Sequence, residues 1–329
     1  MERALYGPGG FYLGHDGPAA HFRTSVHASP LFATAVVRLL REVDATLGHP
    51  DQLAFADLAA GRGELISAVY EQLDGDPLAD RVRLVAVELA ERPAGLPGAI
   101  EWLDELPGGG GKAGERLTGL VLANEYLDNV PCDVVELTAS GLRQVLVAMD
   151  GSEQLGAEPD PAALSWLAEW WPLSEVGQRA EVGRRRDTAW RATVGRLARG
   201  VAVAVDYSHT RDARPPLGTL TGYAHGRQVE PVPDGSCDIT AHVALDSCAE
   251  AGRPSATWSL TLSQRQALRR LGISGERPEH AMAGRDPSGY LRALARAGQA
   301  AELTAEGGLG EFGWLIQGAG VPRLAVLED

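Results

Sequence analysis

The stretch DLAAGRGE, residues 57–64, decides the fold of this 329-residue chain. It joins an apolar run at 53–58, expected to form a strand, to a helix expected from 64 to about 73, so the backbone turns sharply through Gly61 and Gly63. Glycines let a backbone approach a ligand closely, and the helix that follows offers free N–H groups and the positive end of its dipole. Asp57, at the carboxyl end of the strand, can accept a hydrogen bond from a ligand amine. The same pattern also fits an ordinary strand–helix turn, so the surrounding sequence must decide between the two interpretations.

That surrounding sequence alternates between strands and helices. Ser29 and Pro30 mark one helix start as its N-cap and first helical residue. Alternation around Ser140-Gly141 predicts a hairpin over 134–149. Nearly continuous apolar strands separated by helices are typical of a parallel sheet covered on both faces, which predicts a Rossmann-like α/β fold. The further strands are expected at 81–88, 100–103, 117–123, 201–205 and 312–317, and the helices at 30–43, 161–171, 178–199, 263–271 and 286–298.

Polar side chains follow later strands of the expected sheet, at the edge where open α/β sheets bind ligands. Glu88 ends the second strand, where a carboxylate can bind the ribose hydroxyls of a nucleoside, and Asn124-Glu125 ends a later one. A dinucleotide dehydrogenase would use the same edge. Its G-x-G-x-x-G or G-x-G-x-x-A pattern, however, needs a small residue where this chain has Ile66. The bulky side chain therefore disfavours a nicotinamide cofactor.

Composition narrows the range of partners. The formal net charge of −14 argues against nucleic acid, whose binding depends on clustered Lys and Arg, and an acidic protein suits a cationic substrate. The basic run Arg184-Arg185-Arg186 is expected on a solvated helix face. Three cysteines without a C-x-x-C pair favour a reducing compartment over a disulfide framework or a thiolate zinc site.

Several other classes of protein are disfavoured by what the sequence lacks. The opening MERALYGPGG has no apolar core of a secretory signal, and no run of about 18 apolar residues marks a membrane span. A cytoplasmic protein is therefore expected. No G-x-S-x-G elbow of a hydrolase occurs. No bound metal is expected either, because five histidines show no close ligand spacing: His15, His21, His27, His209 and His225.

Several stretches resemble the motifs of one known family. Residues 57–65 are similar to a cofactor loop E-L-G-P-G-R-G-T-L, and 124–131 to N-E-F-F-D-A-L-P. Residues 218–220 and 238–243 are similar to G-T-L-R-A-Y and D-I-T-A-H-V-D, the most specific pair. Further matches are 1–12 with M-x-x-A-L-Y-x-P-x-x-G-Y-Y, 21–32 with G-D-F-x-T-S-P-E-x-S-P-x-F, and 205–208 with D-Y-G. In this order they resemble the MidA family of S-adenosylmethionine-dependent methyltransferases, which includes the mitochondrial complex I assembly protein-arginine methyltransferase.

The resemblance implies a class I methyltransferase sheet that binds S-adenosylmethionine, and methyl transfer to a protein arginine or to a small molecule. The chain departs from the family at two places. Ala59 and Ala60 replace a Gly and a Pro in the cofactor loop, and His21 and Val26-His27 replace an Asp and a Pro-Glu in the N-terminal segment. The second group lies where substrate is expected to enter. The expected cofactor residues are Asp57, Ala59, Gly61, Gly63, Glu88 and Asn124, and the expected catalytic or substrate-contacting residues are Glu125, Asp206, Asp238 and His242.

The chain is expected to form a single domain. Its parts are an N-terminal cap (1–45), a cofactor-binding core (46–150 and 200–207), a helical insert (151–199), a substrate-side insert (208–298) and a C-terminal strand region (299–329). Two alternatives stay open. His242 could be purely structural, and the protein could be a cofactor-binding assembly factor with little turnover. Trp166 and Trp170, four apart on one helix face, are expected in the core or in the interface of a homodimer.

Overall fold

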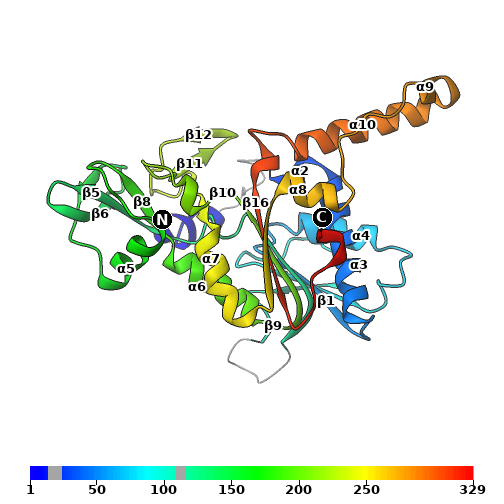
Figure 1. Ribbon diagram of the computed structural model, residues 1–329, viewed down its shortest axis with the longest axis horizontal. Coiled ribbons are helices and arrows are strands. Elements are labelled where there is room, and N and C mark those ends of the chain that lie inside the picture. The colour runs from blue at the N-terminus through cyan, green and yellow to red at the C-terminus, as the bar shows by residue number, and fades with distance from the viewer. Residues whose placement is uncertain (14–23, 109–115, 329) are drawn as a thin grey trace.

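A seven-stranded sheet forms the centre of the molecule (Figure 1). The computed structural model describes residues 1–13, 24–108 and 116–328. In spatial order the strands are β15 (Trp258–Ser263), β16 (Gly313–Ala319), β9 (Leu197–Asp206), β4 (Leu117–Asn124), β1 (Leu53–Leu58), β2 (Val82–Val87) and β3 (Ile100–Leu103). β16 runs antiparallel to both of its neighbours, and the remaining strands run parallel to one another. The predicted Rossmann-like sheet is confirmed, with one reversed strand.

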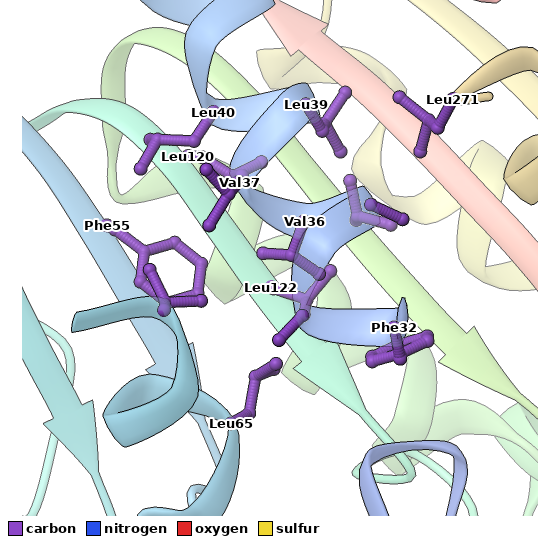
Figure 2. Close-up of a cluster of buried hydrophobic side chains, with 14 of the residues drawn as sticks. Phe32, Val36, Val37, Leu39, Leu40, Phe55, Leu65, Leu120, Leu122 and Leu271 are labelled. Carbon is purple, nitrogen blue, oxygen red and sulfur yellow. The ribbon is translucent and has the colours of Figure 1, made fainter. Parts of the chain in front are cut away.

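Helices cover both faces of this sheet. Side chains of a strand point alternately to opposite faces. Phe55 and Leu122 therefore meet Phe32 and Val36 on one face, a cluster shown in Figure 2. Each large apolar side chain fully buried in this way contributes about 1.5–3 kcal/mol. The first face packs against α3 (Pro30–Leu47), α4 (Glu64–Gln72), α8 (Gln264–Arg270) and the end of α10 (Pro287–Leu303), and the second against α6 (Arg184–Gly195) and α7 (Leu245–Gly252).

The helix α3 starts as its sequence predicts. The Ser29 hydroxyl accepts a hydrogen bond from the Leu31 N–H at 3.1 Å, and Pro30 is the first helical residue. The helix continues to Leu47, beyond its expected end at 43, and stops at Gly48, whose φ of 79° is left-handed.

An antiparallel sheet and a helix lie between β4 and β9 in the chain and stand apart from the central sheet (Figure 1). They are β5 (Asp133–Thr138), β6 (Gly141–Val147), β7 (Glu153–Leu155), α5 (Pro161–Trp170) and β8 (Arg179–Val182). The predicted hairpin at 134–149 is confirmed. The predicted helix over 178–199 is wrong at both ends. Residues 179–182 pair with β5 and bury Ala180 and Val182, so they form a strand before α6 starts, and β9 already begins at Leu197.

Residues 208–256 are rich in Pro, Gly and polar residues, yet they form five short strands and one α-helix. The N-terminal segment, with α1 (Glu2–Tyr6), packs Leu5 and Phe11 against Cys237 and Ile239 of this region. The structure also places β15 and α8, from within the expected insert 208–298, at the edge of the central sheet. The elements of 208–256 are β10 (Ser208–His209), β11 (Thr221–Ala224), β12 (Arg227–Val229), β13 (Asp238–Thr240), β14 (Val243–Ala244) and α7.

The start of α10 extends away from the body of the molecule, with the short helix α9 (Ala281–Arg285) at its tip (Figure 1). The remaining elements are short: α2 (Ser25–Ala28) and the 3₁₀ turns Phe11–Leu13, Arg211–Ala213, Arg253–Ser255, Leu309–Glu311 and Ala325–Leu327. Within the described ranges, no helix is both long enough and apolar enough to span a bilayer. His15 and residues 21–23 of the N-terminal motif lie outside the described residues.

Candidate functional site

A cavity of about 500 Å³ opens at the carboxyl edge of β1, β2 and β4. Its volume falls within the range of small-molecule sites. The structure brings five of the six expected cofactor residues together in its wall: Asp57, Ala59, Gly61, Glu88 and Asn124. The sixth, Gly63, stands just behind the wall as the N-cap of α4.

The glycine turn adopts a conformation that explains its composition. Gly61 and Gly63 have φ of 59° and 80°, values that glycine reaches without steric cost. A Cβ at Gly63 would also lie 2.8 Å from the Leu96 side chain. Ala59 has φ of 60° although it carries a Cβ, and its N–H donates to the Val87 carbonyl at 2.9 Å. The turn is therefore held against β2 by hydrogen bonds even where the residue is strained.

Glu88 links the turn to the end of β2. Its Oε2 accepts a hydrogen bond from the Gly61 N–H at 3.0 Å, and its Oε1 accepts one from the Leu89 N–H at 2.7 Å. Because these bonds fix its carboxylate in the cavity wall, Glu88 is positioned both to brace the turn and to bind a ligand hydroxyl.

Two acceptor atoms in the wall lack partners among the described residues: Oδ2 of Asp57 and Oδ1 of Asn124. Asp57 is only 3% exposed. Burial, and next the neighbouring Glu64 carboxylate, raises the pKa of Asp57 to about 8. A buried acceptor without a donor is costly, so a ligand that supplies an ammonium and N–H groups would satisfy both atoms. The turn and these acceptors fit the amino-acid part of S-adenosylmethionine, and Glu88 fits its ribose.

Glu125 follows Asn124 at the end of β4 and has a left-handed φ of 53°. Its Oε1 accepts hydrogen bonds from Asn124 Nδ2 at 3.2 Å and, more weakly, from the Ser25 N–H at 3.4 Å. Burial, followed by the nearby Asp128 carboxylate, raises the pKa of Glu125 to about 8. A strained acidic residue directly behind a cavity wall is typical of functional positions.

Three further carboxyl groups lie beyond Glu125. Asp206 accepts hydrogen bonds from the Leu127 and Asp128 N–H groups at 3.2 and 3.3 Å, and Asp128 accepts one from the Thr240 hydroxyl at 2.8 Å. Burial and the adjacent Asp128 carboxylate raise the pKa of Asp206 well above its usual range, and burial raises the pKa of Asp128 as well. The group of carboxyls formed by Glu125, Asp128, Asp206 and Asp238 is called the acidic cluster below.

Asp238 connects the acidic cluster to the cavity. Its Oδ1 accepts hydrogen bonds from the Tyr12 hydroxyl at 3.0 Å and from Asn129 Nδ2 at 3.1 Å, and both donors line the cavity. Burial, followed by the Asp128 carboxylate, raises the pKa of Asp238 to about 7. Glu125 and Asp238 thus stand directly behind the wall, each hydrogen-bonded to a residue that lines the cavity, whereas Asp206 and His242 are not part of the wall.

His242 lies farther from the cavity than the sequence predicts for a substrate residue. Its ring stacks on Tyr207 at 5.4 Å, and its carbonyl accepts a hydrogen bond from Arg186 at 2.8 Å. Arg186 also donates to the carbonyls of Asp128 and Val130 and is 1% exposed. The prediction of a solvated basic run is therefore wrong for Arg186, which joins α6 to the loop after β4, whereas Arg184 and Arg185 are exposed.

Several residues of the cavity wall are not among the expected site residues. Asp104 and Glu105 follow β3 as Glu88 follows β2, a signal that was present in the sequence. The other residues lie within the motif stretches 1–12, 21–32 and 124–131, but the motifs alone did not assign them to the wall: Tyr6, Tyr12, Thr24, His27 and Asn129. Within the described part of the chain, no group of three or more His, Cys, Asp or Glu side chains is placed to hold a metal ion.

Comparison with known proteins agrees with this geometry. The model of a family described as "Putative S-adenosyl-L-methionine-dependent methyltransferase" matches residues 31–262. A crystal structure of a COG1565 superfamily member from Burkholderia thailandensis, bound to S-adenosyl-homocysteine, superposes with a TM-score of 0.78 at 26% identity, covering 99% of this chain and 88% of that one. A native crystal structure of a COG1565 superfamily protein from the same organism gives a TM-score of 0.78 at 27% identity with the same coverage. A search of curated proteins yields no match.

The family model covers most of the chain and spans the glycine turn, Glu88 and Asn124. The demethylated cofactor product occupies a structure of similar fold. The chain therefore belongs to this family of S-adenosylmethionine-dependent methyltransferases.

Proposed function

We propose that the methyl acceptor is the guanidinium group of an arginine in a protein substrate. The observation that carries the proposal is the acidic cluster beside the cofactor cavity. Arg186, which is buried beside the cluster, donates its hydrogen bonds to the main-chain carbonyls of Asp128, Val130 and His242. The sequence resemblance to the MidA family points the same way.

The carboxyl groups would orient the acceptor rather than deprotonate it beforehand. A guanidinium has a pKa above 12, so a carboxylate is too weak a base to remove its proton in the ground state. Two of its N–H groups would donate hydrogen bonds to Glu125 and Asp238, directly behind the wall, and hold the third nitrogen in line for attack. S-adenosylmethionine supplies a methyl group on a sulfonium. As the new nitrogen–carbon bond forms, the carbon–sulfur bond breaks with its electron pair left on sulfur, and the nitrogen then loses a proton to a carboxylate.

The test is transfer from S-adenosylmethionine carrying a deuterated methyl group into extract of the source cells. After acid hydrolysis, mass spectrometry of the amino acids should find labelled methylarginine with the natural enzyme. Glu125→Gln should lose about 100-fold or more of the rate while still binding S-adenosylhomocysteine, because a bound guanidinium favours the ionised form of Glu125 and glutamine cannot supply that charge. Glu101→Gln is the matched control, since Glu101 is exposed and paired with Arg83 on β2.

Other outcomes decide against the proposal. Label that appears in a metabolite and not in protein would identify a small-molecule methyltransferase. Label that appears in lysine or histidine would overturn the assignment of the acceptor. Full binding of the cofactor with no labelled product would favour an assembly factor with little turnover.

A further inference from the structure

The cavity wall contains residues that the expected cofactor set does not include. The glycine turn, Glu88 and Asp104 line it after β1, β2 and β3. Tyr6 and Tyr12, from the N-terminal segment, line the same cavity together with Asn129. These tyrosines come from a segment that contributes nothing to the central sheet.

The two tyrosine rings stack on each other. Their centroids lie 5.5 Å apart and their planes differ by 15°. Both side chains are partly exposed, so the stack presents aromatic surface to the cavity. A stacked pair of electron-rich rings offers a flat face of negative potential, which attracts a cation.

Hydrogen bonds hold both rings in this position. The Tyr6 hydroxyl donates to the Asn129 carbonyl at 3.2 Å, and the Tyr12 hydroxyl donates to Asp238 at 3.0 Å. The segment is also anchored by packing. Leu5 and Phe11 are buried against Ile239, and a Cβ at Gly235 would lie 2.6 Å from the Gly9 carbonyl oxygen. A side chain tied at its tip and packed at its base loses little entropy when a ligand binds.

Carboxyl groups lie close to the stack. Asp238 touches Tyr12 directly, and the carboxylates of Asp128 and Asp238 both act on Tyr6 and Tyr12, where they add to burial in raising the pKa of each phenol. The arginines of the wall, Arg62 and Arg196, belong to the glycine turn and to the end of α6, not to the N-terminal segment. A flat cation is the ligand that this combination of rings and carboxylates suits.

We propose that Tyr6 and Tyr12 form a subsite on which the flat, cationic group of the methyl acceptor stacks, with the Asp238 carboxylate beside it. The inference rests on the proposed function, because it assumes that the acceptor is a guanidinium. It adds that the N-terminal segment determines specificity. Arginine stacks on aromatic faces through its planar guanidinium, whereas the tetrahedral ammonium of lysine does not present such a plane.

The experiment measures binding of three tripeptides to the full chain saturated with S-adenosylhomocysteine. The peptides are acetyl-Gly-X-Gly-amide with X as arginine, as citrulline (the same shape without charge) or as lysine (charged but not flat). The natural protein should bind the arginine peptide at least about tenfold more tightly than the other two. Tyr6→Leu and Tyr12→Leu should each weaken arginine binding about 5- to 10-fold and leave cofactor affinity within twofold. Tyr70→Leu is the matched control, because Tyr70 is 40% exposed on α4 and does not line the cavity.

A second measurement does not depend on whether the leucine variants fold. Saturation of the tyrosine ring protons in the natural protein should transfer to the arginine side chain of the bound peptide. Tyr6→Phe and Tyr12→Phe keep a ring in place but remove the tyrosine signal at that position. The variant in which transfer is lost therefore identifies the tyrosine from which it came. Bound peptide without transfer, or leucine variants that bind it normally, would overturn the subsite and leave the proposed function standing.

The remaining outcomes are also decisive. Equal binding of the arginine and citrulline peptides by the natural protein would count against the proposed function itself, and with it the subsite. Equal binding of lysine and arginine would show attraction to charge without stacking and overturn the flat-cation assignment. A parallel loss of S-adenosylhomocysteine affinity in the leucine variants would place the tyrosines at the cofactor.

Discussion

At the scale of single residues, Asp57 offers the sharpest test of the cofactor site. One of its carboxylate oxygens is buried without a partner, and the side chain lines the cavity. Asp57→Asn removes the charge that an ammonium group would pair with. We expect a 10- to 100-fold loss of S-adenosylmethionine affinity, since a hydrogen bond to a charged group contributes about 1.5–3 kcal/mol. Titration calorimetry measures it, with Asp74→Asn, an exposed residue after α4, as the control. Unchanged affinity would remove Asp57 from the site.

Ala59 carries a strain that a smaller residue would relieve. Its φ of 60° costs an L-residue about 1–2 kcal/mol, whereas glycine reaches this region freely but loses about 0.5–1 kcal/mol through the greater freedom of the unfolded chain. Ala59→Gly should therefore raise the free energy of unfolding by about 0.5–1 kcal/mol in a denaturant titration. Ala60 is not among the residues with a positive φ, so Ala60→Gly should lower the free energy of unfolding. If both glycines destabilise equally, the turn is not strained at Ala59.

At the scale of elements, α6 and the loop after β4 are joined by one side chain. Arg186 is buried and donates to three carbonyls, those of Asp128, Val130 and His242. Arg186→Lys keeps the charge but cannot satisfy three carbonyls in this planar arrangement. We expect it to lower the free energy of unfolding by at least about 3 kcal/mol and to weaken cofactor binding, because Asn129 and Val130 line the cavity.

The neighbouring arginines provide the control for that substitution. Arg184 and Arg185 form exposed ion pairs with Asp160 and Glu2, and such pairs contribute about 0–1 kcal/mol. Arg184→Lys should therefore change stability by less than about 0.5 kcal/mol. Equal effects of the two substitutions would mean that the hydrogen bonds of Arg186 do not hold the loop.

Elements whose signals are local could be predicted from the sequence. The strand, glycine turn and helix at 53–72 follow from residues that are neighbours in the chain, and so does the hairpin at 134–149. The strand β8 could not be predicted, because Arg179–Val182 becomes extended only by pairing with β5, more than 40 residues earlier. The same holds for the cavity wall and the carboxyl groups behind it. Tyr12 and Asp238 are 226 positions apart, and only the folded chain brings them together.

At the scale of the whole molecule, the buried carboxyl groups shape how stability depends on pH. The folded-state pKa values of Asp57 and Glu125 are raised to about 8, and that of Asp238 to about 7, chiefly by burial. In the unfolded chain such groups ionise near pH 4. Between about pH 4 and pH 7–8 the folded state therefore binds more protons than the unfolded state, so these groups make stability fall as the pH rises. Groups with a lowered pKa, such as Asp44 beside Arg81, act in the opposite direction and only at lower pH.

The cofactor-free protein should consequently lose stability between pH 5 and pH 7, by about 1.4 kcal/mol per pH unit for each carboxyl that stays protonated only when folded. Urea unfolding at several pH values measures the slope. Asp57→Asn should make the slope shallower by the contribution of one carboxyl, because the amide of asparagine does not titrate. The general repulsion of the net charge acts on both proteins, so the difference between their slopes is free of it. Saturating S-adenosylmethionine should also reduce the slope in the natural protein, since an ammonium beside Asp57 favours its ionised form, but not in the variant. Identical slopes for the natural protein and the variant would show that Asp57 is already ionised over the whole range from pH 5 to pH 7 in the cofactor-free protein. Its unpartnered oxygen would then not be evidence for a bound ammonium group.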